Sequence, residues 1–170
     1  MTPSNIKNQI LVCQGTGCES SKSAKITQAL AEEVKRSGLA ETVQVKTTGC
    51  HGFCQQGPIV IIEPEGIFYA GVKIEDALEV VKSHFVDGKP LERLFYHDPT
   101  TNKAVPLYKD IQFYSKQYRL ILRNCGHIDP EEIDDYIANG GYTALKKVIS
   151  SMESMQVIKE IQRSGLRGRG

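Results

Sequence analysis

Residues 9–18 read QILVCQGTGC, and residues 49–58 read GCHGFCQQGP. The two stretches carry two cysteine pairs, Cys13 with Cys18 and Cys50 with Cys54. Each pair lies on a glycine-rich loop, and the apolar or alternating residues just before each loop predict a strand. A fold that brings these loops together places four thiols at one site.

The segments around the loops predict an α/β fold. Strands are expected over residues 9–13, 42–46, 59–62 and 67–69, and helices over residues 22–36 and 74–85. The first helix forms a crossover between two parallel strands, and Pro64-Glu65-Gly66 turns the last two strands into a β-hairpin. The resulting order, β-α-β-β-β-α, predicts a thioredoxin-like domain over residues 1–87.

The rest of the chain predicts a linker and then a short, mostly helical segment. Residues 88–108 are rich in proline and turn-forming residues, although Leu91, Leu94 and Phe95 favour packing of the first part. Residues 109–170 follow, where Asp129-Pro130 is a typical helix start. Helices over residues 142–151 and 154–163 complete this segment.

Composition excludes several classes of protein. The 170 residues carry 21 Lys and Arg against 20 Asp and Glu, so no nucleic-acid partner is expected, and three arginines near the C-terminus without aromatic partners do not change this. No apolar stretch approaches membrane-spanning length, which predicts no direct membrane insertion. Five cysteines, an odd number, without an export signal favour reduced thiols and a cytoplasmic location.

The four paired cysteines predict a metal centre. A [2Fe-2S] cluster needs four thiolates with two on each iron, and two chelating pairs satisfy it. The glycines around each pair allow backbone N–H groups to turn toward the sulfurs. Cys18 precedes the first predicted helix, whose N-terminal dipole favours a thiolate. The expected chemistry is one-electron transfer.

Three other interpretations of the cysteines stay open. A structural zinc site accepts four cysteines at these spacings, whereas a redox dithiol usually has two residues between its cysteines and fits less well. Four ordinary buried cysteines are the third alternative. His51, between two proposed ligands, is expected to lie near the cluster without binding it, and Cys125 is expected to contribute packing.

Beyond these residues the chain resembles a known family. Cys13-Gln-Gly-Thr-Gly-Cys18, Gly49-Cys50-His51-Gly52-Phe53-Cys54 and Gly57-Pro58 resemble the thioredoxin-like [2Fe-2S] ferredoxin domain of NADH dehydrogenase subunits. Leu122-Arg-Asn-Cys-Gly126, Ile128-Asp-Pro130, Gly140-Gly-Tyr142 and Ser164-Gly-Leu-Arg-Gly-Arg-Gly170 resemble the start of the flavoprotein subunit that oxidises NADH in complex I and its relatives. In NAD(P)-linked hydrogenases and formate dehydrogenases that subunit often carries such a ferredoxin domain in front.

This resemblance implies a component of a multi-subunit oxidoreductase, with other Fe-S and flavin subunits as partners. Electrons would pass between NAD(H), FMN, a [4Fe-4S] cluster and outlying Fe-S centres, but only the [2Fe-2S] site is expected in this chain. Gly168, Arg169 and Gly170 match the first residues of the glycine-rich loop that binds flavin and nucleotide in the family. The remainder of that loop has no counterpart here, so the sequence resembles an N-terminal fragment, with no catalytic residues of its own.

Overall fold

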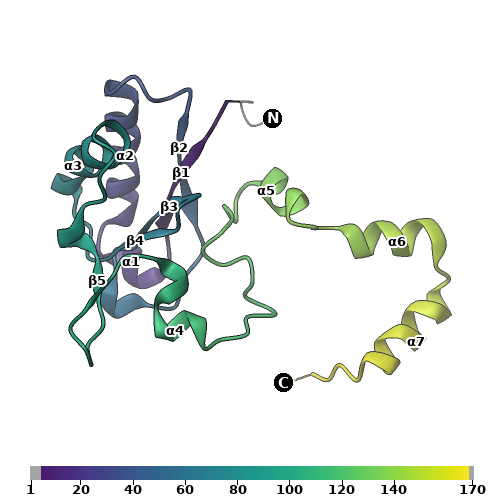
Figure 1. Cartoon of the computed structure of the whole chain (residues 1–170). Coiled ribbons are helices and arrows are strands. Elements are labelled where there is room, and N and C mark those ends of the chain that lie inside the picture. The colour runs from purple at the N-terminus through teal and green to yellow at the C-terminus, as the bar shows by residue number, and fades with distance from the viewer. Residues whose placement is uncertain (1–4, 169–170) are drawn as a thin grey trace. The chain divides into compact units, whose positions relative to one another are not determined.

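The computed structural model describes residues 5–168. The chain divides into two compact units, and the boundary in sequence lies between Glu132 and Ile133. The strands of the first unit are β1 (Asn8–Cys13), β2 (Val43–Thr48), β3 (Val60–Glu63), β4 (Ile67–Tyr69), β5 (Tyr96–His97) and β6 (Ala104–Val105). Its helices are α1 (Thr16–Ser20), α2 (Ser23–Arg36), α3 (Ala77–Val81) and α4 (Gln112–Ser115). Figure 1 shows these elements along the chain. The predicted α/β class is confirmed.

A four-stranded sheet with the order β2-β1-β3-β4 forms the centre of the first unit. β1 and β2 are parallel, with Cys13 opposite Thr48, and they are joined by α2 as the crossover pattern predicts. β3 pairs antiparallel with β1 and with β4, which confirms the predicted hairpin. The first two strands therefore end at the same edge of the sheet.

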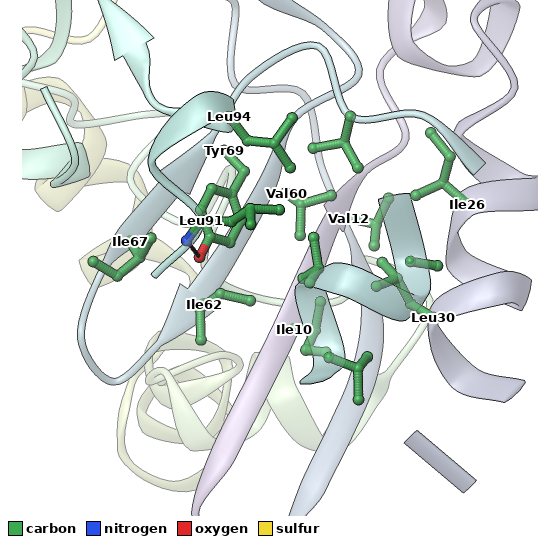
Figure 2. Packing of buried hydrophobic residues seen from close by; sticks show 14 of the residues in the cluster. Ile10, Val12, Ile26, Leu30, Val60, Ile62, Ile67, Tyr69, Leu91 and Leu94 are labelled. Carbon is green, nitrogen blue, oxygen red and sulfur yellow. Dashed lines mark hydrogen bonds between the residues drawn. The ribbon is translucent and has the colours of Figure 1, made fainter. Parts of the chain in front are cut away.

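One face of the sheet packs against α2 and α3, which lie side by side on it (Figure 1). Alternate residues of β1, Ile10 and Val12, point to this face, because successive side chains of a strand point to opposite sides. They meet Ile26 and Leu30 from the apolar side of α2, as Figure 2 shows. This face holds the larger of the two hydrophobic clusters, and it contains no cysteine.

The opposite face holds a second cluster that includes two of the cysteines. Leu11 and Cys13 of β1 point to this side, together with Phe68 of β4. Tyr96 and Tyr114 cover them, and both come from segments beyond the domain predicted over residues 1–87. Two of the four candidate metal ligands, Cys13 and Cys18, are therefore built into the core of this face.

The segment predicted as a linker, residues 88–108, is packed against the sheet, in its first part as its apolar residues Leu91, Leu94 and Phe95 indicate. Leu91 and Leu94 are buried in the α2 face, where the Leu91 N–H donates to the Tyr69 hydroxyl at 3.0 Å (Figure 2). Tyr96 begins the β5–β6 hairpin and lies buried on the other face. The proline and turn residues of this segment form its bends, while the burial of its apolar residues stabilises its packing against the sheet.

Two helix starts differ from the predictions. Residues 16–20, expected as part of a loop before the first helix, form the short helix α1, so Cys18 lies inside a helical turn. Asp129, expected as a helix cap, accepts the Thr47 hydroxyl at 2.8 Å and the Glu131 N–H at 3.0 Å, and the next helix begins only at Ile133. A tertiary hydrogen bond thus engages the carboxylate that was expected to cap.

Over residues 133–168 the second unit contains three helices, α5 (Ile133–Ala138), α6 (Thr143–Ser151) and α7 (Ser154–Ser164). The last two agree with the predicted helices over residues 142–151 and 154–163. Their apolar side chains, among them Leu145, Ile149 and Ile158, are exposed. No helix within residues 5–168 is long and apolar enough to cross a bilayer.

Candidate functional site

The two cysteine loops meet at one edge of the sheet because the strands before them are parallel neighbours. Cys13 ends β1 opposite Thr48, which ends β2, so both loops leave the sheet side by side. Backbone hydrogen bonds hold this edge: the Gln14 N–H donates to the Thr48 carbonyl at 2.9 Å, and the Cys13 N–H donates to the Ile59 carbonyl at 3.0 Å. The register of the sheet, a long-range feature, therefore brings together the two pairs.

The four paired thiols form one connected group. The Cys13 side chain interacts with Cys18 within the first loop and with Cys50 across the loops, and Cys50 interacts with Cys54. All four are free thiols. Within residues 5–168 no set of three or more His, Cys, Asp or Glu side chains surrounds the position of a single metal ion. Each of the four thiols instead interacts with one or two neighbouring thiols of the group.

Hydrogen bonding gives Cys13 a lower pKa than its partner Cys18. The hydrogen bond from the Cys18 thiol lowers the pKa of Cys13 to about 6, against burial, and the backbone N–H groups of His51 and Gly15 add to this effect. The pKa of Cys18 is raised correspondingly by the same hydrogen bond and by its burial. A thiolate is thus stabilised at the end of β1, which is the protonation state that binds metal.

The other loop balances opposing effects on its thiol. The Gly52 N–H, 3.2 Å from the Cys50 sulfur, lowers the pKa of Cys50, but burial and the charges of Cys13 and Cys54 outweigh it and raise the pKa overall. The physical reason is the loss of solvation on burial together with repulsion from the neighbouring thiolates. A bound cation would remove this repulsion.

Three glycines form a cradle around the sulfurs. A Cβ added at Gly15 would lie 2.7 Å from the Cys50 sulfur, and one at Gly57 would lie 2.8 Å from the Cys18 sulfur. Gly17 approaches Cys54, with 3.4 Å from its added Cβ to the sulfur. Only residues without a Cβ let the backbone approach the sulfurs this closely. With thiolate donors and N–H groups aimed at them, the residues fit a [2Fe-2S] cluster.

The pairs differ in their access to solvent. Cys13 and Cys18 are each 1% exposed, whereas Cys50 and Cys54 are exposed at the surface. A cluster held by both pairs would have one side in the core and the other at the surface. Such an arrangement protects inorganic sulfide and leaves a short path for an electron.

The remaining predicted residues take different places. His51 is buried beside the loop, with both ring nitrogens unpaired within the described part of the chain. Its pKa is lowered to about 3, first by burial and then by the charges of His127 and Arg119. Cys125 is half-buried, and its side chain lies near Gly49. Gly168 belongs to the second unit, and a Cβ added there would have no atom within 4 Å. Arg169 and Gly170 lie outside the described residues.

Some residues beside the cysteines had no local signal in the sequence. Tyr114 belongs to the buried cluster of Cys13 and Cys18, and Tyr108 packs partly against it. Arg119 lies 5.7 Å from the centroid of the Tyr114 ring. These side chains come from residues 108–119, far from either cysteine pair in sequence, so only a pattern of buried aromatics after the predicted domain could have drawn attention to them.

Comparison with known proteins identifies the family. The profile described as thioredoxin-like [2Fe-2S] ferredoxin matches residues 2–84. A 2Fe-2S ferredoxin from Clostridium pasteurianum is 39% identical over 98 residues, which span 53% of this chain and 96% of the ferredoxin. The chain belongs to the thioredoxin-like [2Fe-2S] ferredoxin family. This membership makes it an electron-transfer protein of the iron-sulfur type and confirms the predicted thioredoxin-like fold.

The chain is also similar to ferredoxins from Aquifex aeolicus and to a hydrogenase subunit. A 2Fe-2S ferredoxin from Aquifex aeolicus is 37% identical over 78 residues, covering 45% of this chain and 70% of the relative. A solved thioredoxin-like [2Fe-2S] ferredoxin from the same organism is 32% identical, covers 52% of this chain and 89% of its own, and has a TM-score of 0.48. The NADP-reducing hydrogenase subunit HndC of Solidesulfovibrio fructosivorans is 58% identical over 55 residues, which are 32% of this chain and 11% of that subunit.

Proposed function

We propose that Cys13, Cys18, Cys50 and Cys54 ligate a [2Fe-2S] cluster and that the protein passes single electrons through it. The observation that carries this proposal is the connected group of four thiols at one sheet edge, enclosed by glycine backbone. When bound, the cluster supplies a one-electron couple. The chain supplies thiolates, N–H groups directed at the sulfurs, and a buried pair that shields one side from water.

The competing function is a zinc-stabilised interaction domain, because zinc also accepts four thiolates. The two proposals differ in measurable ways. Anaerobically purified protein should be brown, with about two irons and two inorganic sulfides per chain. A colourless protein with one zinc per chain would favour the structural site instead.

Serine substitutions test the four ligands individually. Cys13→Ser, Cys18→Ser, Cys50→Ser and Cys54→Ser should each reduce the iron and sulfide content, because each removes one of the four thiolates. Cys125→Ser is the matched control, since it removes a free thiol beside the same loop that is not among the proposed ligands. Equal iron and sulfide content in a paired-cysteine variant and in the control would contradict the ligand assignment.

We further infer that this ferredoxin serves an NAD(P)H-linked oxidoreductase of the NADH dehydrogenase or NADP-reducing hydrogenase type. The motifs of residues 122–170 that resemble an NADH-oxidising flavoprotein support this, as does the similarity to the hydrogenase subunit HndC. FMN, NAD(H) and a [4Fe-4S] cluster would belong to the complete parent subunit, and the partners would be its other Fe-S and flavin subunits.

The 170-residue chain is expected to carry the cluster without oxidising NADH by itself. The resemblance supplies only Gly168, Arg169 and Gly170 of the glycine-rich loop that binds nucleotide and flavin. A dye-reduction assay with NADH or NADPH should therefore show no turnover above that of buffer, although dithionite reduces the cluster. Steady NADH-dependent dye reduction by the purified chain would refute this part of the proposal.

A further inference from the structure

A segment that follows the residues matched to the ferredoxin family packs against the cysteine loops. The match ends at residue 84, and we call residues Tyr108–Asp129 the cap. The buried Thr48 hydroxyl donates to the Ile128 carbonyl at 2.8 Å, and Thr47 donates to Asp129 at the same distance. These bonds attach the end of the cap to the end of β2, one residue before the second cysteine loop begins.

Close packing also joins the cap to His51. Gly126 has a φ of +90°, and a Cβ added there would lie 2.2 Å from Cε1 of the His51 ring. No other residue type could lie so close. The ring of Tyr108 packs edge-on against the same histidine, with 5.7 Å between centroids. The cap therefore lies directly on the residue that follows Cys50.

Tyr114 of the cap belongs to the same buried cluster as Cys13 and Cys18. It is 6% exposed, and its hydroxyl has no hydrogen-bond partner among the residues that the structure describes. Its ring packs edge-on against His51 at 6.3 Å and against Phe53 at 5.7 Å, the sequence neighbours of Cys50 and Cys54. A buried hydroxyl without a partner is unfavourable, so this group calls for an acceptor.

The packing of the ring beside Cys13 and Cys18 indicates where that acceptor lies, and the electrostatic surroundings agree. Burial is the largest cause of the raised pKa of Tyr114, and the charges of Tyr108, Cys13 and Cys50 contribute, whereas Arg119 opposes them. One cysteine from each pair, Cys13 and Cys50, therefore influences the pKa of the Tyr114 phenol. A sulfur of a cluster held between those cysteines would be a hydrogen-bond acceptor at the unpaired hydroxyl.

Arg119 adds positive charge to the cap. Its guanidinium lies 5.7 Å from the Tyr114 ring centroid and 6.0 Å from that of Tyr108, and it donates to the Cys125 carbonyl at 2.9 Å. A cavity of about 330 Å³ beside these rings is lined by no carboxylate and by four basic side chains: Lys109, Arg119, Arg123 and His127. The cap therefore concentrates basic side chains beside Tyr114, which favours negative charge there.

Building on the proposed cluster, we propose that Tyr114 donates a hydrogen bond to a cluster sulfur and that Arg119 reinforces it, so that the cap raises the cluster's midpoint potential. Reduction adds one electron and thus one negative charge to the cluster. A donor hydrogen bond and a nearby cation both stabilise the more negative state. The chain would then hold its cluster at a higher potential than the same domain without the cap.

A redox titration of the cluster-loaded full chain, followed by electron paramagnetic resonance, tests the proposal. Tyr114→Phe should shift the midpoint to a more negative potential while iron and sulfide per chain stay at the wild-type level. Tyr96→Phe is the matched control, because Tyr96 is equally buried in the same aromatic cluster but no cysteine perturbs its hydroxyl. Its potential should equal that of the wild type. Equal potentials for Tyr114→Phe and the wild type would overturn the proposal.

A spectroscopic readout separates hydrogen bonding from a structural role. Resonance Raman spectra should show Fe–S bands that shift in D₂O, and Tyr114→Phe should lose part of this shift while Tyr96→Phe keeps all of it. If Tyr114→Phe does not accumulate as folded protein, Arg119→Gln replaces it; an unchanged potential in that variant overturns the proposal as well. Failure of the wild type to bind iron would instead refute the proposed function, so the two failures are distinguishable.

Discussion

Alanine at position 15 tests whether the backbone really needs to lie against the sulfurs. Gly15 has a φ of −59° and a ψ of 151°, a conformation that alanine adopts without strain. An added Cβ, however, would meet three atoms of Cys50: Sγ at 2.7 Å, Cβ at 2.9 Å and Cα at 3.3 Å. Because two of these atoms do not move with side-chain rotation, relief requires the backbone of the second loop to shift.

The size of the effect follows from these distances. Carbon atoms pack favourably at about 3.5–4.0 Å, so the two loops must separate by roughly 1 Å. Overpacking of this kind costs about 1–3 kcal/mol. Since about 1.4 kcal/mol corresponds to a tenfold change in an equilibrium constant, retention of the cluster should weaken by roughly 5- to 150-fold. At about 4 °C per kcal/mol, the thermal midpoint should fall by about 4–12 °C.

The assay compares Gly15→Ala with Gly49→Ala in anaerobically prepared protein. At Gly49 the nearest atom to an added Cβ is 3.8 Å away, on Cys125, which is an ordinary contact. Iron and sulfide per chain and the thermal midpoint should therefore stay near wild-type values in Gly49→Ala and fall in Gly15→Ala. Wild-type iron content and thermal midpoint in Gly15→Ala would refute the argument that the cradle requires glycine.

Three further predictions concern the packing of the first unit, each measured by denaturant unfolding. Tyr69→Phe should cost about 1–3 kcal/mol, because the buried Leu91 N–H loses its acceptor; an unchanged midpoint would contradict it. Thr48→Val should cost a similar amount, about 1–3 kcal/mol, by removing the donor to the Ile128 carbonyl, and no loss would mean that the cap is not attached there. Burial lowers the pKa of His84 below its usual 6.5, so the unfolded chain binds more protons below pH 6.5 and stability falls as the pH drops. His84→Gln should make that fall shallower, and an unaltered slope would rule out a contribution from His84.

Much of the fold follows from local spacing. The helical period of Ile26, Leu30 and Val34, buried together against the sheet, identifies α2, and the turn around Gly66 identifies the β3–β4 hairpin. These signals are carried by residues a few positions apart, so they can be recognised without knowing what they pack against. The positions of the four cysteines on loops after strands belong to the same class of information.

The packing of residues 88–132 could be predicted only in part, from the apolar residues Leu91, Leu94 and Phe95 near its start. Its prolines and turns are typical of a linker, but a few apolar side chains, Leu91, Leu94 and Tyr96 among them, bury themselves on both faces of the sheet. Asp129 could have capped a helix, and only the position of Thr47 turns its carboxylate into a tertiary acceptor. The local sequence is compatible with a free linker and with a packed segment, and with Asp129 as a cap or as a tertiary acceptor. Long-range contacts decide which of these forms.

By itself, the amino-acid sequence determined the α/β order of elements and the two cysteine pairs, because periodicity and spacing are properties of neighbouring residues. Only the tertiary structure decided that the pairs are connected through Cys13 and Cys50, that one pair is buried, and that Tyr114 lies over them. The hydrogen bond from Thr48 to Ile128 shows the reason, since it joins residues 80 positions apart. Sheet register and burial arise from such distant contacts, which no local pattern encodes.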